Sequence, residues 1–394
     1  MKCKFETKTI GDCCDIIKES IHPEKGQFYT CFSLPAFDNS NTPEILNGEE
    51  IKSSKFVLDE NTILFNKLNP KFRRVWNIHS LEKYENTICS TEFLPLKAKA
   101  NIEQDYLYYY VSSPYFTRLM DGIRTGTSNS QQRIDWKQFL REPINVPSLP
   151  IQRKAVSLLR NIDKKIELNN AINNNLAEQS QAIFAEFMCK YPYVLSPLGD
   201  MAEIIDCLHS KKPKAVNGTT YQLLQLNNIT DSGFLDLSSK YYISKSDYEN
   251  WTRKCEIVEG DCVITNVGRI GAVSQAPNGT HAAMGRNMTC IRLRNDKPFY
   301  SYLITALLSP HIRREIMKNT DEGTIMGALN VKNIPLLLFP MFALPTMNAL
   351  EDLLSPIRKA IEQNYLSNQM LSLLRDSLLP RLMSGELDVS NIEI

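Results

Sequence analysis

The sequence lacks the short motifs that mark common catalytic sites. Its 394 residues contain no GxxxxGK[ST] phosphate loop, no GxSxG nucleophile turn and no HExxH zinc motif. It also has no Asn-Pro-Pro-Tyr or Asp-Pro-Pro-Tyr tetrad of the kind found in adenine-methylating enzymes. The five histidines are not at metal-ligand spacing, and Cys207 with His209 is a pair without two further ligands. These absences indicate a binding protein without a catalytic or metal site.

The chain also has no excess of charge, with 45 Lys and Arg against 44 Asp and Glu. This balance does not exclude a nucleic-acid partner, because acidic helices can offset basic clefts. The longest apolar run, residues 334–344, is interrupted by proline and too short to span a bilayer. The ten cysteines form no CxxC pair and no secretory signal begins the chain, so we expect reduced thiols in a cytoplasmic protein without a membrane partner.

A nucleotide-binding loop is not supported either, although residues 266–271, NVGRIG, have spaced glycines. A dinucleotide site requires a helix after the glycines and an acid further downstream, and neither is evident here. We therefore interpret the glycines as turn positions between strands at residues 261–265 and 272–275.

What the sequence does contain is one long helical pattern that occurs twice. From Leu149 to about Tyr191, apolar residues recur at steps of three and four without an interrupting proline or glycine, which predicts a single long helix. A second copy begins at Leu344, at a constant offset. The residues that we predict to pair the two helices are Ile162, Ile166, Asn169 and Leu176 in the first copy and Ile357, Ile361, Asn364 and Leu371 in the second.

Asparagines on the apolar faces suggest how the two helices pair. Asn169 and Asn364 each lie on an apolar seam, where a polar residue can fix register and orientation, although a solvated position on the seam is an equal alternative. Short connections favour an antiparallel pair over a parallel pair. A helix of roughly 38 residues is about 57 Å long, so the pair would act as a spacer between two globular regions.

The repeat extends into these globular regions. Gly11-Asp12 is echoed by Gly199-Asp200, Ser113-Pro114 by Ser309-Pro310, and Gly126-Thr127 by Gly323-Thr324. Between these markers the two halves diverge. We predict an α+β fold with a pseudo-two-fold internal repeat, in which two globular α/β domains are separated by two long helices paired as an antiparallel coiled coil. Its segments are residues 1–148, 149–191, 192–343 and 344–394.

Local patterns in the first half suggest a surface for recognition. Strand-like runs occupy residues 28–32, 55–58 and 62–65, and residues 106–119 have a helical pattern rich in aromatics. That helix leads into residues 121–133, a polar, glycine-containing segment whose side chains can bond phosphates or base edges.

Two stretches of the second half carry a resemblance to a known family. The opening LGDMAEIID at Leu198 and the closing LLPRLMSGELDV at Leu378, with the repeat between them, resemble the specificity (S) subunit of type I restriction-modification enzymes along essentially the whole chain. The resemblance implies that each globular domain is a target recognition domain that reads one half of an asymmetric bipartite DNA target. The helices would then set the spacing and dock adenine methyltransferase (M) subunits.

The resemblance also implies how the chemistry is divided. Restriction or motor (R) subunits would join the complex, and S-adenosylmethionine, ATP and Mg would act on the partner subunits, leaving this chain without a cofactor or catalytic residue. For contacts to double-stranded DNA, we predict Arg73, Arg74, Arg124, Gln131, Gln132 and Arg133 in the first domain, and Lys211, Lys212, Lys214, Arg253, Arg269, Arg286 and Asn287 in the second.

Two other classes of function remain as alternatives. The near-zero net charge suits a coiled-coil scaffold that binds proteins and does not recognise DNA. A hydrolase with paired Asp or Glu residues is a further alternative, although no pair stands at a spacing that supports it.

Overall fold

The computed structural model describes residues 5–124, 132–230, 233–294, 299–321, 327–384, 386, 387 and 389. The chain forms two compact units. Unit 1 consists of Met1–Ile166 with Met370–Ile394, and unit 2 consists of Glu167–Gln369. Each long helix therefore contributes one part to each unit. The division of the chain at residues 148, 191 and 343 into recognition domains and helices stays a prediction.

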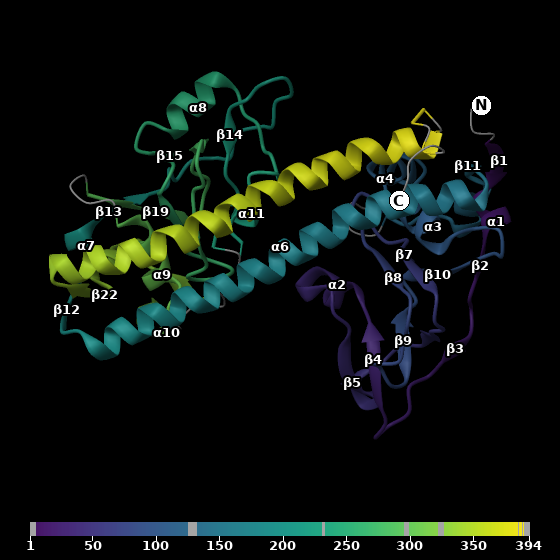
Figure 1. The fold of residues 1–394 in the computed structure, drawn as a ribbon, viewed down its shortest axis with the longest axis horizontal. Coiled ribbons are helices and arrows are strands. Elements are labelled where there is room, and N and C mark those ends of the chain that lie inside the picture. The colour runs from purple at the N-terminus through teal and green to yellow at the C-terminus, as the bar shows by residue number, and fades with distance from the viewer. Residues whose placement is uncertain are drawn as a thin grey trace. The chain divides into compact units, whose positions relative to one another are not determined.

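Unit 1 contains two sheets and a two-stranded ribbon (Figure 1). Its strands are β1 (Glu6–Thr9), β2 (Cys14–Ile16), β3 (Ser20–Ile21), β4 (Phe28–Phe32), β5 (Glu44–Asn47), β6 (Lys55–Val57), β7 (Thr62–Asn66), β8 (Val75–Ile78), β9 (Thr87–Ser90), β10 (Phe93–Ala98) and β11 (Pro143–Val146). Its short helices are α1 (Ile10–Cys13), α2 (Leu34–Ser40), the 3₁₀ turn η1 (Gly48–Glu50), α3 (Gln104–Val111), α4 (Pro114–Gly122) and α5 (Trp136–Arg141).

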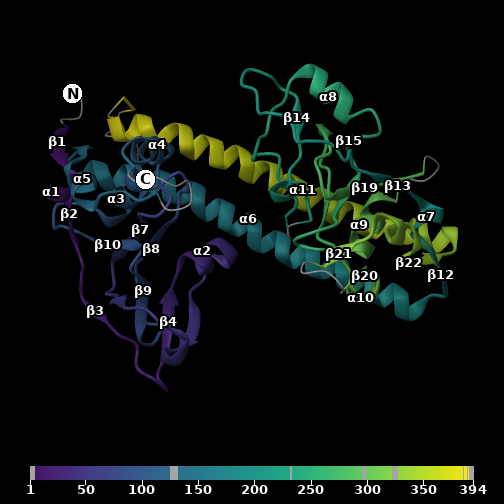
Figure 2. The ribbon, with the colours of Figure 1, turned by 180° about the vertical axis from the view of Figure 1, so that it is seen from behind.

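Unit 2 is built from a similar set of elements (Figure 2). Its strands are β12 (Tyr193–Pro197), β13 (Ala202–Asp206), β14 (Gln222–Leu223), β15 (Glu256–Val258), β16 (Cys262–Thr265), β17 (Val273–Gln275), β18 (His281–Ala283), β19 (Met288–Leu293), β20 (Thr320–Asp321), β21 (Ala328–Leu329) and β22 (Leu338–Phe342). Its short helices are α7 (Leu198–Met201), η2 (Leu226–Asn228), α8 (Lys245–Trp251), α9 (Tyr300–Leu307), α10 (Pro310–Lys318) and η3 (Val331–Leu336).

The strand order shows that the two units repeat one fold. The central sheet has the order β2-β10-β7-β8 in unit 1 and β13-β19-β16-β17 in unit 2, with antiparallel neighbours throughout. The second sheet of unit 2, β14-β18-β15, also matches β4-β9-β6 of unit 1, because β14 and β18, like β4 and β9, are parallel while the third strand is antiparallel. Unit 1 adds β3 and β5 at the edges. The predicted α+β class and internal repeat are therefore confirmed.

Burial explains why these strands and helices form. The strand β7 is buried along its whole length, with Ile63, Leu64 and Phe65 at its centre, where the sequence predicts a strand. The helical prediction for residues 106–119 is wrong in one respect, because the segment forms two helices. Ser113 caps α4 by accepting a hydrogen bond from the Phe116 N–H at 3.0 Å, and Pro114 occupies the first helical position, which proline favours.

The two long helices are α6 (Leu149–Lys190) and α11 (Leu344–Ser384), which begin where the sequence predicts. In unit 2 they lie side by side and antiparallel (Figures 1 and 2). The Asn169 Nδ2 donates to Asn368 Oδ1 at 2.8 Å, and Asn364 Nδ2 donates to Asn173 Oδ1 at 2.9 Å, so the residue numbers rise along one helix as they fall along the other. The predicted antiparallel pairing is confirmed.

The predicted helix-pairing residues differ in burial. Asn169 and Ile361 are buried, at 1% and 5% exposure. The other six are partly buried: Ile162, Ile166, Leu176, Ile357, Asn364 and Leu371. Whether the asparagines fix the register stays a prediction. No helix within the described ranges is long and apolar enough to cross a membrane.

Candidate nucleic-acid interface

The predicted contact residues of unit 1 lie mainly on two neighbouring segments. Residues 67–74 join β7 to β8, and the N–H of Asn69 in this loop donates to the carbonyl of Gln132 at 2.7 Å. Asn69 has a φ of 51°, in the left-handed region that asparagine tolerates better than most residues. The structure therefore brings Arg73 and Arg74 close in the fold to Gln132 and Arg133, whereas Gln131 lies outside the described residues.

All four predicted arginines of unit 1 contact carboxylates of the same unit. The pairs are Arg73 with Asp376, Arg74 with Asp38, Arg124 with Asp121 and Arg133 with Glu92. Arg74 and Arg133 each form two hydrogen bonds with one carboxylate, at 2.6 and 2.7 Å and at 2.6 and 3.2 Å. This fork geometry fixes the direction of a guanidinium. A phosphate would have to compete with these acids.

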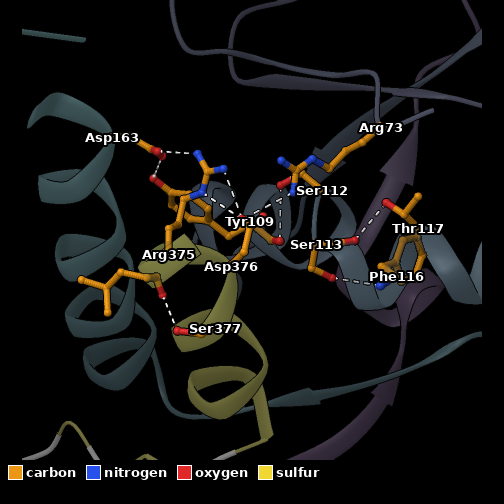
Figure 3. Close-up of polar contacts among 11 residues, drawn as sticks. Arg73, Tyr109, Ser112, Ser113, Phe116, Thr117, Asp163, Arg375, Asp376 and Ser377 are labelled. Atoms are coloured by element: carbon orange, nitrogen blue, oxygen red, sulfur yellow. Dashed lines mark hydrogen bonds and ion pairs between the residues drawn. The ribbon is translucent and has the colours of Figure 1, made fainter. Parts of the chain in front are cut away.

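Arg73 belongs to a polar cluster that joins three elements of unit 1 (Figure 3). Its guanidinium lies 3.6 Å from Asp376 of α11. The neighbouring Arg375 contacts Asp163 of α6 at 2.8 Å, and the Tyr109 hydroxyl of α3 donates to the same carboxylate at 2.6 Å. Burial alone would lower the pKa of Arg375, but its hydrogen bonds to Asp163 raise it. The cluster lines a cavity of about 210 Å³ and ties the helix pair to the globular part of unit 1.

In unit 2, three of the predicted residues surround one cavity. Lys212, Arg286 and Asn287 line a hollow of about 400 Å³. The Lys212 ammonium lies 3.9 Å from the ring centroid of Tyr241, which orients it by a cation–π contact. Asn287 has a φ of 63° in the turn before β19. Two cations and an amide at one opening form a surface suited to phosphate and base edges.

The remaining predicted residues of unit 2 are elsewhere. Lys211 and Lys214 are exposed on the loop after β13, and Arg253 is exposed after α8. Arg269 lines a different cavity, of about 500 Å³, and its Nη1 donates to the carbonyl of Ile229 at 3.1 Å. The sequence did not identify Arg313, which lines that same cavity and donates to the Ile270 carbonyl at 3.2 Å. The structure therefore divides the predicted set of unit 2 between two cavities and exposed loops.

Among the described residues, two side-chain groups have ligand atoms close enough for a metal. Asp206 joins Cys207 and His209, the pair noted in the sequence, and its carboxylate lies 2.7 Å from the His209 ring. Cys255, Asp261 and Cys290 form a buried group, but Asp261 is bound there by Arg292 at 2.8 Å. Hydrogen bonds with Asp261 raise the pKa of Arg292, and this cation opposes a metal at the same carboxylate. The absence of a metal site stays a prediction.

The helix pair carries an exposed charged face and exposed apolar side chains. Lys164 and Lys165 on α6 are exposed. Within unit 2, Leu168 is 55% exposed and Leu366 37% exposed. Within unit 1, Met370 and Leu373 are about 70% exposed, at 71% and 70%. Exposed apolar side chains are typical of surfaces that bind other chains where they form one contiguous patch.

Part of the chain is similar to a known protein family. Residues 3–178 match the model of a family described as "Type I restriction modification DNA specificity domain". The type I restriction enzyme HindI specificity subunit of Haemophilus influenzae (strain ATCC 51907 / DSM 11121 / KW20 / Rd) is 25% identical over 175 residues, which are 41% of this chain. The match spans only 38% of that relative.

Solved structures of two specificity subunits also align with the chain. The type I restriction-modification S subunit of M. genitalium has 14% identity and a TM-score of 0.49, covering 97% of this chain and 96% of that one. The HsdS subunit of Thermoanaerobacter tengcongensis has 15% identity and a TM-score of 0.40, covering 97% of both chains. The family match is confined to residues 3–178, less than half of the chain, and over that stretch the chain is similar to type I restriction modification DNA specificity domains.

Proposed function

We propose that this chain is the sequence-specific DNA-binding subunit of a type I restriction-modification complex. The observation that carries the proposal is the repeat. Unit 1 contains most of the matched specificity domain, and unit 2 repeats the strand order of both of its sheets. A recognition frame that occurs twice, with different side chains on each copy, suits an asymmetric target with one half read by each unit.

The chain itself is a non-catalytic member of the complex in this proposal. Adenine methyltransferase subunits dock on the long helices, which set the spacing of the two half-targets, and restriction or motor subunits join them. Methyl transfer with S-adenosylmethionine and cleavage with ATP and Mg belong to those partners. The exposed apolar residues of the helices support a partner surface, and the cations around the Lys212 cavity support a contact with DNA.

The experiment is selection of duplexes from a random library by the full chain, together with the methyltransferase subunit of its own host. We expect two short conserved half-sites of different sequence, separated by unconserved base pairs. A single continuous site shorter than one helical turn would contradict the proposal. Absence of duplex binding at both low and moderate salt would favour the protein-binding scaffold, which the near-neutral charge of the chain also suits.

A further inference from the structure

A short segment of unit 2, residues 233–235, is held by the side of α11. The ring of Phe234 is 2% exposed and Leu235 is fully buried. The segment pairs with the end of β17, because the Leu235 N–H donates to the Gln275 carbonyl at 3.0 Å and the Gln275 N–H donates to the Gly233 carbonyl at 3.0 Å. Two residues of the helix contact the Phe234 ring.

Arg358 of α11 makes the first set of these contacts. Its guanidinium carbon lies 3.3 Å from the centroid of the Phe234 ring. Nη2 donates to the Gly233 carbonyl at 2.6 Å, and Nε donates to Gln275 Oε1 at 3.0 Å. Within the described ranges, no carboxylate oxygen lies within 4.0 Å of this guanidinium. The cation is therefore satisfied by a carbonyl and a ring of the segment and by the side-chain amide of Gln275 in β17.

Tyr365 of α11 makes the second set. Its ring stacks on Phe234 with the centroids 5.7 Å apart and the planes at 16°. Its hydroxyl donates to the Leu235 carbonyl at 2.8 Å and accepts a hydrogen bond from Gln369 Nε2 at 2.7 Å. Tyr365 follows Arg358 by seven positions, which is about two helical turns and places both on one face of α11. Phe234 is thus in contact with a guanidinium and a phenol from the same helix.

The held segment is connected to a predicted DNA contact. The Thr230 hydroxyl donates to the Phe234 carbonyl at 2.8 Å, and the neighbouring Ile229 carbonyl accepts the hydrogen bond from Arg269 Nη1 at 3.1 Å. Thr230 and Arg269 line the same cavity of about 500 Å³. A displacement of residues 233–235 would therefore shift Thr230 and Ile229, and with them the carbonyl that binds the Arg269 side chain.

We propose that Arg358 and Tyr365 are positioning residues for target reading by unit 2. They clasp Phe234 and so fix the segment that supports Arg269, which couples the orientation of the recognition surface to α11. This inference rests on the proposed function. Arginine is required at position 358 because its planar fork makes two directed hydrogen bonds while stacking on a ring, and the single ammonium of lysine cannot do all three.

The test uses the full-length Arg358→Lys and Tyr365→Phe variants with the host methyltransferase subunit. The readout is discrimination at each half-site of a duplex selected by the wild-type protein. Tyr365→Phe removes one hydrogen bond but keeps the stacked ring, so we expect discrimination at the half-site of unit 2 to fall about 2- to 10-fold. Arg358→Lys should reduce it about 10-fold or more, because a charged fork is lost. The half-site of unit 1 should be read as before.

Arg314→Lys is the matched control, since Arg314 is exposed on α10 and lies outside the clasp. Amide hydrogen exchange at Leu235 and Gln275 provides a second readout, and we expect it to accelerate in both clasp variants. Faster exchange with unchanged discrimination at the unit 2 half-site would overturn the positioning role. Equal losses at both half-sites would show a general loss of structure and overturn it too. A wild-type protein without any sequence preference would instead refute the proposed function itself.

Discussion

In unit 1, the four predicted arginines form ion pairs with acids of the same unit. Two of them, Arg74 and Arg133, donate hydrogen bonds to both oxygens of one carboxylate. In unit 2, Lys211, Lys214, Arg253 and Arg286 have no carboxylate oxygen within 4.0 Å among the described residues. Exposed ion pairs contribute about 0 to 1 kcal/mol, so stability does not explain the pairs of unit 1. The same strand order therefore carries arginines paired with acids in unit 1 and, at these four positions of unit 2, cations without such a partner among the described residues.

A second comparison concerns one contact that a long helix makes in each unit. In both units, that helix presents a side-chain oxygen to the N-terminal N–H groups of a short helix. In unit 1, Gln152 Oε1 of α6 accepts from the Glu103 N–H at 2.8 Å. In unit 2, Glu351 of α11 accepts from the N–H groups of Ser301 and Tyr302 at 3.1 and 2.8 Å. In both units, a side chain of a long helix caps the N-terminus of a short helix. The amide of Gln152 is neutral and the carboxyl of Glu351 is ionisable, so the stability that capping provides should depend on pH only in unit 2.

The largest expected effect is a loss of stability, and it tests whether α4 of unit 1 and α10 of unit 2 are packed equally well. Phe116 and Ile312 occupy the third position of α4 and α10, and both are fully buried. Phe116→Ala should lower the free energy of unfolding by about 3–5 kcal/mol, and Ile312→Ala by about 2–5 kcal/mol, because each leaves a cavity. Hydrogen exchange resolved by residue should show each loss confined to the mutated unit.

Arg118→Ala on the exposed face of α4 is the control, with a change within about 0.5 kcal/mol. If Phe116→Ala accelerated exchange throughout unit 2 to the same degree as in unit 1, the description of two separate compact units would be wrong. The comparison between them would then lose its basis.

The sequence predicted those parts of the fold that local pattern determines. The starts of α6 and α11 follow from a Leu-Pro entry and an unbroken apolar face, and β4 and β7 follow from short apolar runs. The break between α3 and α4 was missed, although Ser113-Pro114 is a helix-start signal, because aromatic residues continue the helical pattern on both sides.

The site was less predictable because its contacts join distant parts of the chain. Arg73 was identified as a cation, but its partner Asp376 is about three hundred residues away in the sequence, and only folding brings them together. The clasp of Phe234 by Arg358 is similar, with 125 positions between Arg358 and Gly233. The residue type is enough to predict that a charged side chain is a candidate for the site. Its partner depends on tertiary packing and cannot be predicted from the residue type.

The second prediction rests on the proposed function and compares a paired arginine of unit 1 with an unpaired arginine of unit 2 among the described residues. Arg286→Ala should reduce the slope of log affinity against log salt on duplex DNA by roughly 0.9, the value for one phosphate contact. Arg74→Ala should change the slope less, because Asp38 already balances that charge. Both slopes are measured with the full chain on one non-specific duplex, and Lys245→Ala, at an exposed pair with Glu249, is the control. Equal reductions for Arg286 and Arg74 would show that the pairing in unit 1 does not limit its contact with DNA.

The smallest expected effect is a pH dependence of stability that distinguishes Glu351 from Gln152. Burial raises the pKa of Glu351 above its ordinary value of 4.5, against the lowering effect of its hydrogen bonds to Tyr302 and Ser301. The folded protein then binds the proton more tightly than the unfolded chain does, so stability falls as the pH rises from 4.5 through the folded pKa. Glu351→Gln should remove this decline while changing stability at neutral pH by about 1 kcal/mol or less. Thermal unfolding between pH 4 and 7 measures this decline, with Glu186→Gln, exposed on α6, as the control. A Glu351→Gln profile parallel to that of the wild type would mean that the acid of unit 2 caps α9 no differently from the amide of unit 1.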